Sequence, residues 1–286
     1  MQLLAGGLAN GSVYGLIAIG FVIIFKSSSI LNFSQGELMM VGAYLAFVII
    51  MEWQVNFYLG VLIALSIAGI FGLLLNAFIF QRMINEPVFS SIMITVGLAS
   101  LLRSVTGIVF KLEESSIVSP VGDAVVNIGG IAIWQIHLLT IAVAILLFGI
   151  FFVFFKYTSL GIGMRAAAED QGVAQLMGVS IKIVFGLSWA IAAIVAAIGG
   201  IFMAQLSAVT PEMYLIGLRA LPAAFLGGID SIPGAIIGGL IIGIIESFAG
   251  GYISGGAKEV VAFIMLFIIL LVRPYGLFGT REIKRV

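Results

Sequence analysis

Few residues of this chain have the types and spacing that catalysis requires. The sequence contains no cysteine and one histidine, His137, which leaves no thiolate nucleophile and no His/Cys cluster for a metal ion. It has neither a G-x-S-x-G turn for a nucleophilic serine nor a G-x-x-x-x-G-K-S/T loop for nucleotide phosphates. We therefore expect a chain that is not an enzyme, with no catalytic residue, metal or cofactor of its own. Any nucleotide that drives it must bind to another chain.

Three charged residues lie within or beside strongly apolar runs. Ser34 precedes a helical run and Glu37 follows three residues later, a spacing that favours mutual capping of the helix start. Arg103 lies near the middle of the run 90–110, so we expect it to face another helix, a cavity or a carboxylate rather than lipid. Glu246 lies near the end of its run, where we expect its carboxylate to reach water rather than to line a pore.

A polar stretch, residues 156–182, lies between two long apolar runs and reads KYTSLGIGMRAAAEDQGVAQLMGVSIK. Its alanine-rich part favours a helix, Gly172 is expected to separate this helix from a second short one, and Gly178 to end the second. Two such helices form a compact knob that suits docking into a groove, with an ordinary loop as the alternative. Its polar and apolar contacts are predicted to come from Arg165, Glu169, Asp170, Ala166, Ala174, Leu176 and Met177.

The composition excludes a soluble domain, because 62% of the residues are hydrophobic and 9% are charged. Apolar runs of about 20 residues recur along the chain, which predicts an all-α, polytopic integral membrane protein with about eight to nine transmembrane helices, including short or broken ones. The run 217–229 reaches only about 20 Å as a helix and is predicted to be a half helix. The net charge is zero, which disfavours nucleic acid as a partner.

The distribution of lysine and arginine predicts the orientation in the membrane. With the N-terminus outside and nine passes, only Lys111, Arg219 and Lys258 fall outside the cytoplasm, apart from Arg103 within its helix. We expect a bacterial inner membrane, with residues 156–182 and the C-terminal tail in the cytoplasm. The outer segment 111–134, rich in glycine and β-branched residues, is predicted to form a short strand or an irregular loop.

Glycines spaced by four residues place small surfaces on one helix, where a second helix can approach closely. The pairs are Gly234 with Gly238 and Gly239 with Gly243. Packing within the chain and packing between subunits fit this spacing equally well.

The stretch 156–182 resembles the coupling loop of permease subunits from branched-chain amino acid ABC importers of the LivH type. The family pattern LGxxxRAxxxDxxxAxLMG is matched by Leu160, Gly161, Arg165, Ala166, Asp170, Ala174, Leu176, Met177 and Gly178. In that family the loop docks on a separate ATP-binding subunit, and the resemblance implies the same role for these residues. Ile162 departs from the family, in which a basic residue is often found at this position.

Segments near both ends of the chain resemble the same family. They are NGSVYGLIAIGF and LNFSQGELMMVGAY near the N-terminus, and AAFLGGIDSIPGAIIGGLIIGIIE and VVAFIMLFIILLVRPYGLFG near the C-terminus. Ser34 and Gln35 replace the usual Ala-His pair. Since the matches cover nearly the whole chain, the resemblance implies a single permease domain over residues 1–286.

The resemblance implies an importer with several other subunits. These are a second permease, either LivM-like or a copy of this chain, two ATP-binding subunits that carry ATP and Mg, and an external solute-binding protein, all in contact with a lipid membrane. The solute would be a branched-chain or related amino acid. An ATP-independent secondary transporter or channel, or the same importer type for urea or short amides, remains the alternative.

The translocation path is predicted to run along broken elements, because backbone groups without helical partners are tolerated at membrane depth only beside protein or a water-filled cavity. These elements are expected at residues 32–42 and 226–234. The predicted lining residues are Asn32, Ser34, Gln35, Glu37, Gly42, Gly227, Gly228 and Ser231.

Overall fold

The computed structural model describes residues 1–83, 86–110, 116–119, 121–122, 124–128 and 131–279. Its α-helices, in chain order, are α1 (Gln2–Ser28), α2 (Gln35–Phe47), α3 (Phe57–Phe78), α4 (Val88–Val109), α5 (Gln135–Tyr157), α6 (Ser159–Glu169), α7 (Gln171–Leu176), α8 (Ile181–Leu206), α9 (Met213–Gly227), α10 (Ile232–Tyr252) and α11 (Gly255–Val272). A π-helical turn, Val48–Glu52, continues α2, and a 3-10 turn, Phe80–Met83, follows α3.

Within the described residues, eight helical stretches are long and apolar enough to cross a membrane, and α9 is a shorter apolar helix. The predicted all-α membrane protein with about eight to nine spans is therefore confirmed. Helices α1 and α8 lie at the centre and are mostly buried, whereas α4, α5 and α11 expose apolar side chains along most of their length. Such an exterior suits lipid or another membrane subunit.

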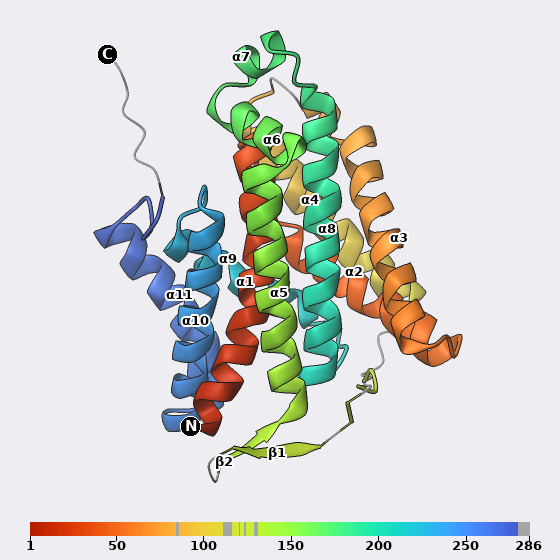
Figure 1. Cartoon of the computed structure of the whole chain (residues 1–286), viewed down its shortest axis with the longest axis vertical. Helices are drawn as coiled ribbons and strands as arrows, with labels where there is room; N and C mark the ends of the chain where they lie inside the picture. The colour runs from red at the N-terminus through yellow and green to blue at the C-terminus, as the bar shows by residue number, and fades with distance from the viewer. Residues whose placement is uncertain (84–85, 111–115, 120, 123, 129–130, 280–286) are drawn as a thin grey trace.

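The bundle has two distinct ends (Figure 1). The short helices α6 and α7 lie at one end, called here the knob end. Strands β1 (Val125–Ile128) and β2 (Ile131–Trp134) pair as an antiparallel hairpin at the other, the hairpin end. Of the short strand or irregular loop expected for the segment 111–134, the described part contains these two short strands. Lys111 and the basic tail used to predict the orientation, Arg281, Lys284 and Arg285, lie outside the described residues.

Helices α2 and α9 both begin inside the bundle rather than at one of its ends. After α1 reaches the knob end, the chain turns back. At the start of α2, the side-chain amide (Nε2) of Gln35 donates to the Ala192 carbonyl midway along α8. After α8 reaches the hairpin end, the chain turns back again and α9 begins at Met213. The predicted half helix is confirmed, and it starts four residues before the apolar run.

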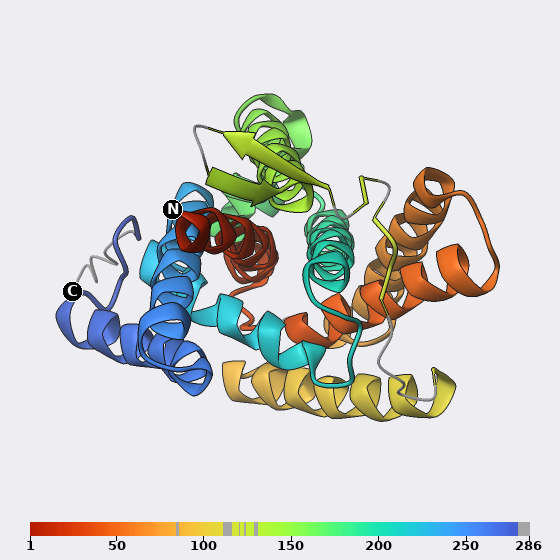
Figure 2. The ribbon, with the colours of Figure 1, turned by 90° about the horizontal axis from the view of Figure 1, so that it is seen from below.

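We call α2 and α9 the half-helices, because both start inside the bundle. They meet near their starts, where glycine lets their backbones touch. A methyl group on Gly36 would collide with the Tyr214 carbonyl oxygen, and one on Gly217 would collide with the Gly36 backbone. Figure 2 shows α9 and α2 nearly end to end, below α1 and α8 in that view. Only a residue without a side chain permits this approach.

The chain contains two sets of four helices that run in opposite directions. Each set has a long central helix, a half-helix and two further spanning helices, α1–α4 in one and α8–α11 in the other. Helix α1 packs against α8 and α10, and α8 packs correspondingly against α1 and α3. Inverted sets of this kind are common in membrane transporters. Helix α5 joins them and has no counterpart in either set.

The spaced glycines of α10 pack against helices of the same chain. Gly239 and Gly243 lie against the backbone of α1 at Gly11, while Gly234 and Gly238 lie against α9. Of the two alternatives left by the sequence, the structure therefore assigns these glycines to packing within the chain.

We predict that Gly239→Ala destabilises the chain, because the new methyl group would meet the backbone of Gly11 and Gly15, which cannot move aside as a flexible side chain can. The expected loss is about 1–3 kcal/mol, measured as a fall in thermal unfolding temperature in detergent. Gly149→Ala in α5 is the matched control, since no described atom lies within 4 Å of the added carbon. Equal unfolding temperatures for the two variants would contradict this packing.

Candidate functional site

The knob begins with a sharp turn between α5 and α6 at Thr158. The Thr158 hydroxyl donates to the Phe154 carbonyl at the end of α5, at 2.6 Å, and accepts from the Gly161 backbone N–H of α6 at 3.0 Å. Gly161 is buried, and a methyl group there would collide with the α5 backbone at Phe154. One threonine thus caps two helices, and the knob is attached directly to a spanning helix without a linker.

Asp170 separates the two knob helices, so the prediction that Gly172 forms this joint is wrong. Asp170 has an extended backbone, with φ −156° and ψ 111°, and its Oδ1 accepts from the Val173 N–H at 2.9 Å. A carboxylate at a helix start satisfies a free backbone N–H and complements the helix dipole. Gly172 lies within α7. The polar side chain, rather than the glycine, therefore stops one helix and starts the next.

Gly178 ends α7 as the sequence predicts. Its φ of +88° is left-handed, and the Val179 N–H returns to the Ala174 carbonyl while the Gly178 N–H returns to Gln175, both at 3.0 Å. These two bonds form a Schellman motif, which satisfies the last carbonyls of the helix. Both ends of this six-residue helix are therefore fixed by local hydrogen bonds.

The tip of the knob is apolar and exposed. Leu176 is 88% exposed and Met177 is 80% exposed, although side chains of this kind are normally buried in a folded chain. Arg165, Ala166, Glu169 and Asp170 are exposed as well, whereas Ala174 is buried in the knob. The expectation that Ala174 offers a surface contact is therefore wrong. We call the exposed side chains of Leu160, Ile162, Val173, Leu176 and Met177 the knob face.

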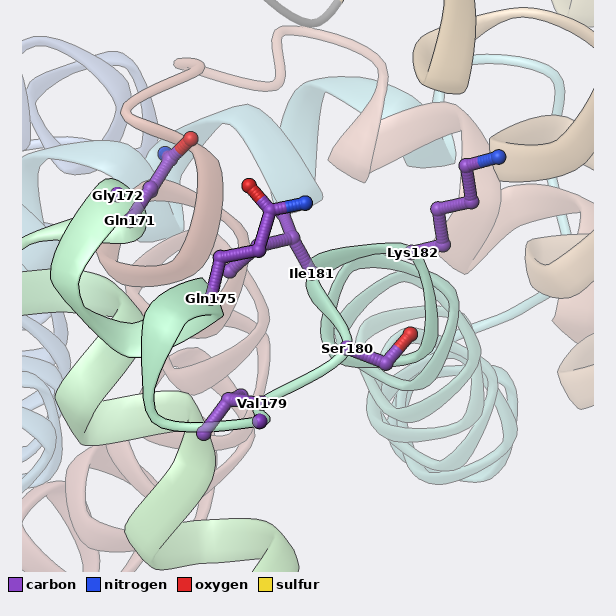
Figure 3. Close-up of a pocket in the computed structure, with 8 residues that line it drawn as sticks. Gln171, Gly172, Gln175, Val179, Ser180, Ile181 and Lys182 are labelled. Atoms are coloured by element: carbon purple, nitrogen blue, oxygen red, sulfur yellow. The ribbon is translucent and has the colours of Figure 1, made fainter.

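Weak polar contacts and buried side chains join the knob to the bundle. Met164 and Ala167 of α6 are buried, and the Gln171 amide donates to the Ser27 carbonyl of α1 at 3.5 Å. An open hollow of about 450 Å³ lies between α7 and the start of α8. Figure 3 shows Gln175 and Ser180 on its two sides. The knob therefore touches α1 while it joins α5 to α8.

A second candidate site lies where α2, α4 and α9 meet. The Arg103 guanidinium of α4 donates to Oε1 of Glu37 at 2.6 Å and lies over the Tyr214 ring of α9, 3.5 Å from its centre. The Ser34 side chain makes no capping hydrogen bond to the described residues. The predicted mutual cap of Ser34 and Glu37 is therefore wrong, because an arginine distant in sequence takes the carboxylate. Of the three neighbours expected for Arg103, namely another helix, a cavity or a carboxylate, the structure shows a carboxylate.

Lipid is an unfavourable neighbour for Arg103. It lies about four turns from the start of α4 and just under two turns from its end, and a charged side chain at the centre of a membrane helix costs about 2.5–3.5 kcal/mol on insertion scales. Its side chain is nevertheless 45% exposed, while that of Glu37 is 4% exposed. Charged residues in spanning helices face a bundle interior or a water-filled cavity. This face of α4 is therefore covered by protein or by water.

A second ion pair lies on the same side of the bundle. The Arg219 guanidinium of α9 donates to Oε1 of Glu259 on α11 at 2.9 Å, and their side chains are 13% and 67% exposed. Sequence reasoning missed this pair, because Arg219 was counted with the outer basic residues although it lies within α9. Its position inside a short apolar run was the available signal.

Glu246 is buried, so the prediction that its carboxylate reaches water is wrong. Glu246 is fully buried. Its Oε2 accepts from the Tyr14 hydroxyl of α1 at 2.6 Å. Oε1 has no hydrogen-bond partner among the described residues. The close approach of α10 to α1 and α9 covers the carboxylate.

The predicted path residues near α2 are buried and bonded to one another. Asn32 donates to Gln35 Oε1 at 3.1 Å and accepts from the Ser34 hydroxyl at 2.7 Å. Gly42 packs against Ala197 of α8. Asn32 Oδ1 also accepts from the Ser34 backbone N–H at 3.1 Å, which gives one backbone group of this buried segment a partner.

The predicted path residues 227–231 lie at the knob end, in the turn from α9 to α10. Gly228 has φ +109°, and Ser231 Oγ accepts from the Gly234 N–H at 3.1 Å. The Phe278 N–H donates to the Gly227 carbonyl at 2.9 Å. The turn is therefore bound to the end of the described chain, and its role in a path stays a prediction.

We predict that Tyr14→Phe destabilises the chain by about 1–3 kcal/mol, because Glu246 would lose its hydrogen-bond donor while it stays buried. Thermal unfolding in detergent would measure the loss. Tyr252→Phe on the same helix as Glu246 is the control, since Tyr252 is 78% exposed. An unfolding temperature unchanged by Tyr14→Phe would show that this bond contributes nothing to stability.

Two inverted helix sets, half-helices that start face to face and ion pairs within the bundle together define a polytopic membrane transport protein. The sequence matches the family described as "Branched-chain amino acid transport system / permease component" over residues 3–270. The chain belongs to this permease family, which confirms the family inferred from the sequence motifs.

Several characterised relatives match along their whole length. The high-affinity branched-chain amino acid transport system permease protein LivH of Escherichia coli is 31% identical, over all of this chain and 97% of LivH. The corresponding protein BraD of Pseudomonas aeruginosa is 30% identical, over all of this chain and 98% of BraD. The structure of PsaBC from Streptococcus pneumoniae in complex with Fab has the same fold, with a TM-score of 0.54 at 16% identity, over 96% of this chain and 93% of that one.

Proposed function

We propose that this chain, as one permease domain over residues 1–286, is the membrane-spanning subunit of an ATP-binding cassette importer. The knob face is proposed to dock on an ATP-binding partner. The observation that carries this proposal is the exposure of Leu176 and Met177 on a helix fixed at both ends. Rigid, exposed apolar side chains are typical of helices that bind in a groove of another protein.

The proposed importer contains two ATP-binding subunits, which carry ATP and Mg, a second permease and an external solute-binding protein. The second permease is a LivM-like chain or a copy of this one. Support comes from the family match and from the apolar exteriors of α4, α5 and α11. Among the described residues, no group of three or more His, Cys, Asp or Glu could hold a metal ion.

We propose a branched-chain or related amino acid as the solute. The support is the match to LivH and BraD over the whole chain, since both are named for branched-chain amino acid transport. The same importer type acting on urea or short amides is the alternative, and competition of these solutes with leucine for uptake would separate the two.

The proposed orientation places the knob end in the cytoplasm of a bacterial cell, with the chain in the inner membrane. Several basic residues lie near this end, namely Lys26, Arg82, Lys156, Arg165, Lys182 and Arg273. Basic residues concentrate in the cytoplasmic loops of membrane proteins.

In the proposed mechanism, closure of the ATP-binding subunits pushes the knob. The knob joins α5 to α8 and touches α1, so its displacement acts directly on the central helices that hold both half-helices. Rocking of one helix set against the other would then open the path to each side in turn. The hollow beside Gln175 would receive a side chain of the partner.

We predict that Leu176→Ala combined with Met177→Ala reduces binding of the ATP-binding subunit at least about tenfold, because removal of two buried interface anchors typically costs more than 1 kcal/mol each. Co-purification and ATP-driven uptake would measure this effect. Leu59→Ala combined with Leu62→Ala is the control, since these leucines of α3 are 53% and 63% exposed but lie outside the knob. Full ATPase binding by the first variant would refute the proposed dock.

The orientation can be read with single cysteines, because the sequence has none of its own. Leu176→Cys in the knob should react with a membrane-impermeant maleimide only in inside-out vesicles, and Val125→Cys in β1 only in intact cells or spheroplasts. Both positions are exposed. The opposite labelling pattern would reverse the proposed topology.

An ATP-independent transporter or channel would move solute without other subunits. Reconstitution of this chain alone, beside the complete complex, separates the two classes. Uptake by the chain alone that needs neither ATP nor a binding protein would favour the alternative.

A further inference from the structure

We propose that a zwitterionic solute passes along the outer side of α9, where Arg103 contacts its carboxylate and Glu259 contacts its ammonium group. We call this surface the α9 seam, defined by Glu37, Arg103, Tyr214, Arg219 and Glu259. The inference rests on the proposed transport of amino acids and assigns specific residues to the path.

The seam lies between two spanning helices, α4 and α11, on one side of the bundle. Figure 2 shows α9 crossing between α4 and the α10–α11 pair. Tyr214 lies under Arg103 of α4, and Arg219 binds Glu259 of α11, so α9 is joined to both neighbours by charged side chains. Leu215, between these two contacts along α9, is 41% exposed. The outer side of the half-helix is therefore open at this level.

The two ion pairs expose opposite charges. In the first pair the arginine is the accessible partner, with Arg103 45% exposed and Glu37 4% exposed. In the second pair the carboxylate is accessible, with Glu259 67% exposed and Arg219 13% exposed. Each accessible charge is paired with a less exposed partner of opposite sign. The seam thus presents one positive and one negative group, and its four charges sum to zero.

This pattern suits a solute that carries both charges and no net charge. A guanidinium has five N–H donors in a planar fork that matches a carboxylate, and Arg103 gives one nitrogen to Glu37. The remaining donors are available to an α-carboxylate. Tyr214 and Arg219 are about 7.5 Å apart along the axis of α9 and about 140° apart around it, so the proposed solute turns around the half-helix as it moves from one accessible charge to the other. Exposed Leu215 offers an apolar contact for the solute's side chain between them.

The first test uses the complete importer in proteoliposomes and radiolabelled leucine. We expect Arg103→Gln and Glu259→Gln each to reduce leucine uptake at least tenfold, with the subunits still assembled and with ATP hydrolysis still stimulated by the binding protein. Arg82→Gln and Glu52→Gln remove exposed charges away from the seam and should leave uptake unchanged. Uptake within twofold of the unsubstituted importer, or loss of subunit assembly, would overturn the proposal, because assembly loss would make the seam a subunit contact.

A second test depends neither on the identity of the solute nor on whether the importer still folds after a charged residue is replaced. Leu215→Cys in the seam and Ile145→Cys in α5 each introduce the single thiol of this chain. Ile145 is the more exposed position, at 63% against 41%, but it lies among apolar side chains that would face lipid.

We expect a water-soluble thiol reagent to label Leu215→Cys at least ten times faster than Ile145→Cys in the assembled importer. Equal or slower labelling of Leu215→Cys would overturn the path. If the unsubstituted importer carries no leucine, the proposed solute fails, while fast labelling at Leu215→Cys still supports a water-filled seam.

Discussion

The arrangement of this chain depends on the backbone N–H groups of two helices, α2 and α9, that start inside the bundle rather than at one of its ends. The first turn of any helix has N–H groups without helical partners, and inside a membrane each must find a partner in the protein. Before α2, the Ser34 backbone N–H donates to Asn32 Oδ1 at 3.1 Å and the Gln35 backbone N–H donates to the Asn32 carbonyl at 3.4 Å. Gly36 and Gly217 then allow the two starts to touch. Helix α8 packs against α2, and α1 packs against α9.

Features set by local sequence could be predicted. Apolar length gave the spanning helices, the shortness of the run 217–229 gave the half-helix, and Gly178 gave the end of α7. The predicted joint of the knob, Gly172, lies two residues beyond the observed one, Asp170. Aspartate and glycine can both interrupt a helix, and the sequence does not show which of the two ends α6. Asp170 starts α7 because its carboxylate accepts a hydrogen bond from the Val173 N–H, whereas glycine has no side chain that could accept one.

Features set by distant partners could not be predicted. Glu37 has a capping role available locally, but Arg103 lies 66 residues away and binds it instead. Glu246 is close to the end of its helix, and only the packing of α1 and α9 against α10 shows that Tyr14 covers it. The same limit applies to Arg219 and Glu259, which are 40 residues apart. A single sequence shows that a buried charge needs a partner without identifying it.

Helix α5 determines that the second helix set runs in the opposite direction to the first, because it adds one crossing between them. The first set crosses the membrane an even number of times, so without one further crossing the second set would start from the same side and run in the same direction as the first. Its half-helix would then enter from the side that α2 enters, and the two starts could not meet head to head. Parity therefore ties the contact between Gly36 and Gly217 to a helix that touches neither glycine. A change of one crossing between the two sets would therefore put both half-helices on the same side of the membrane.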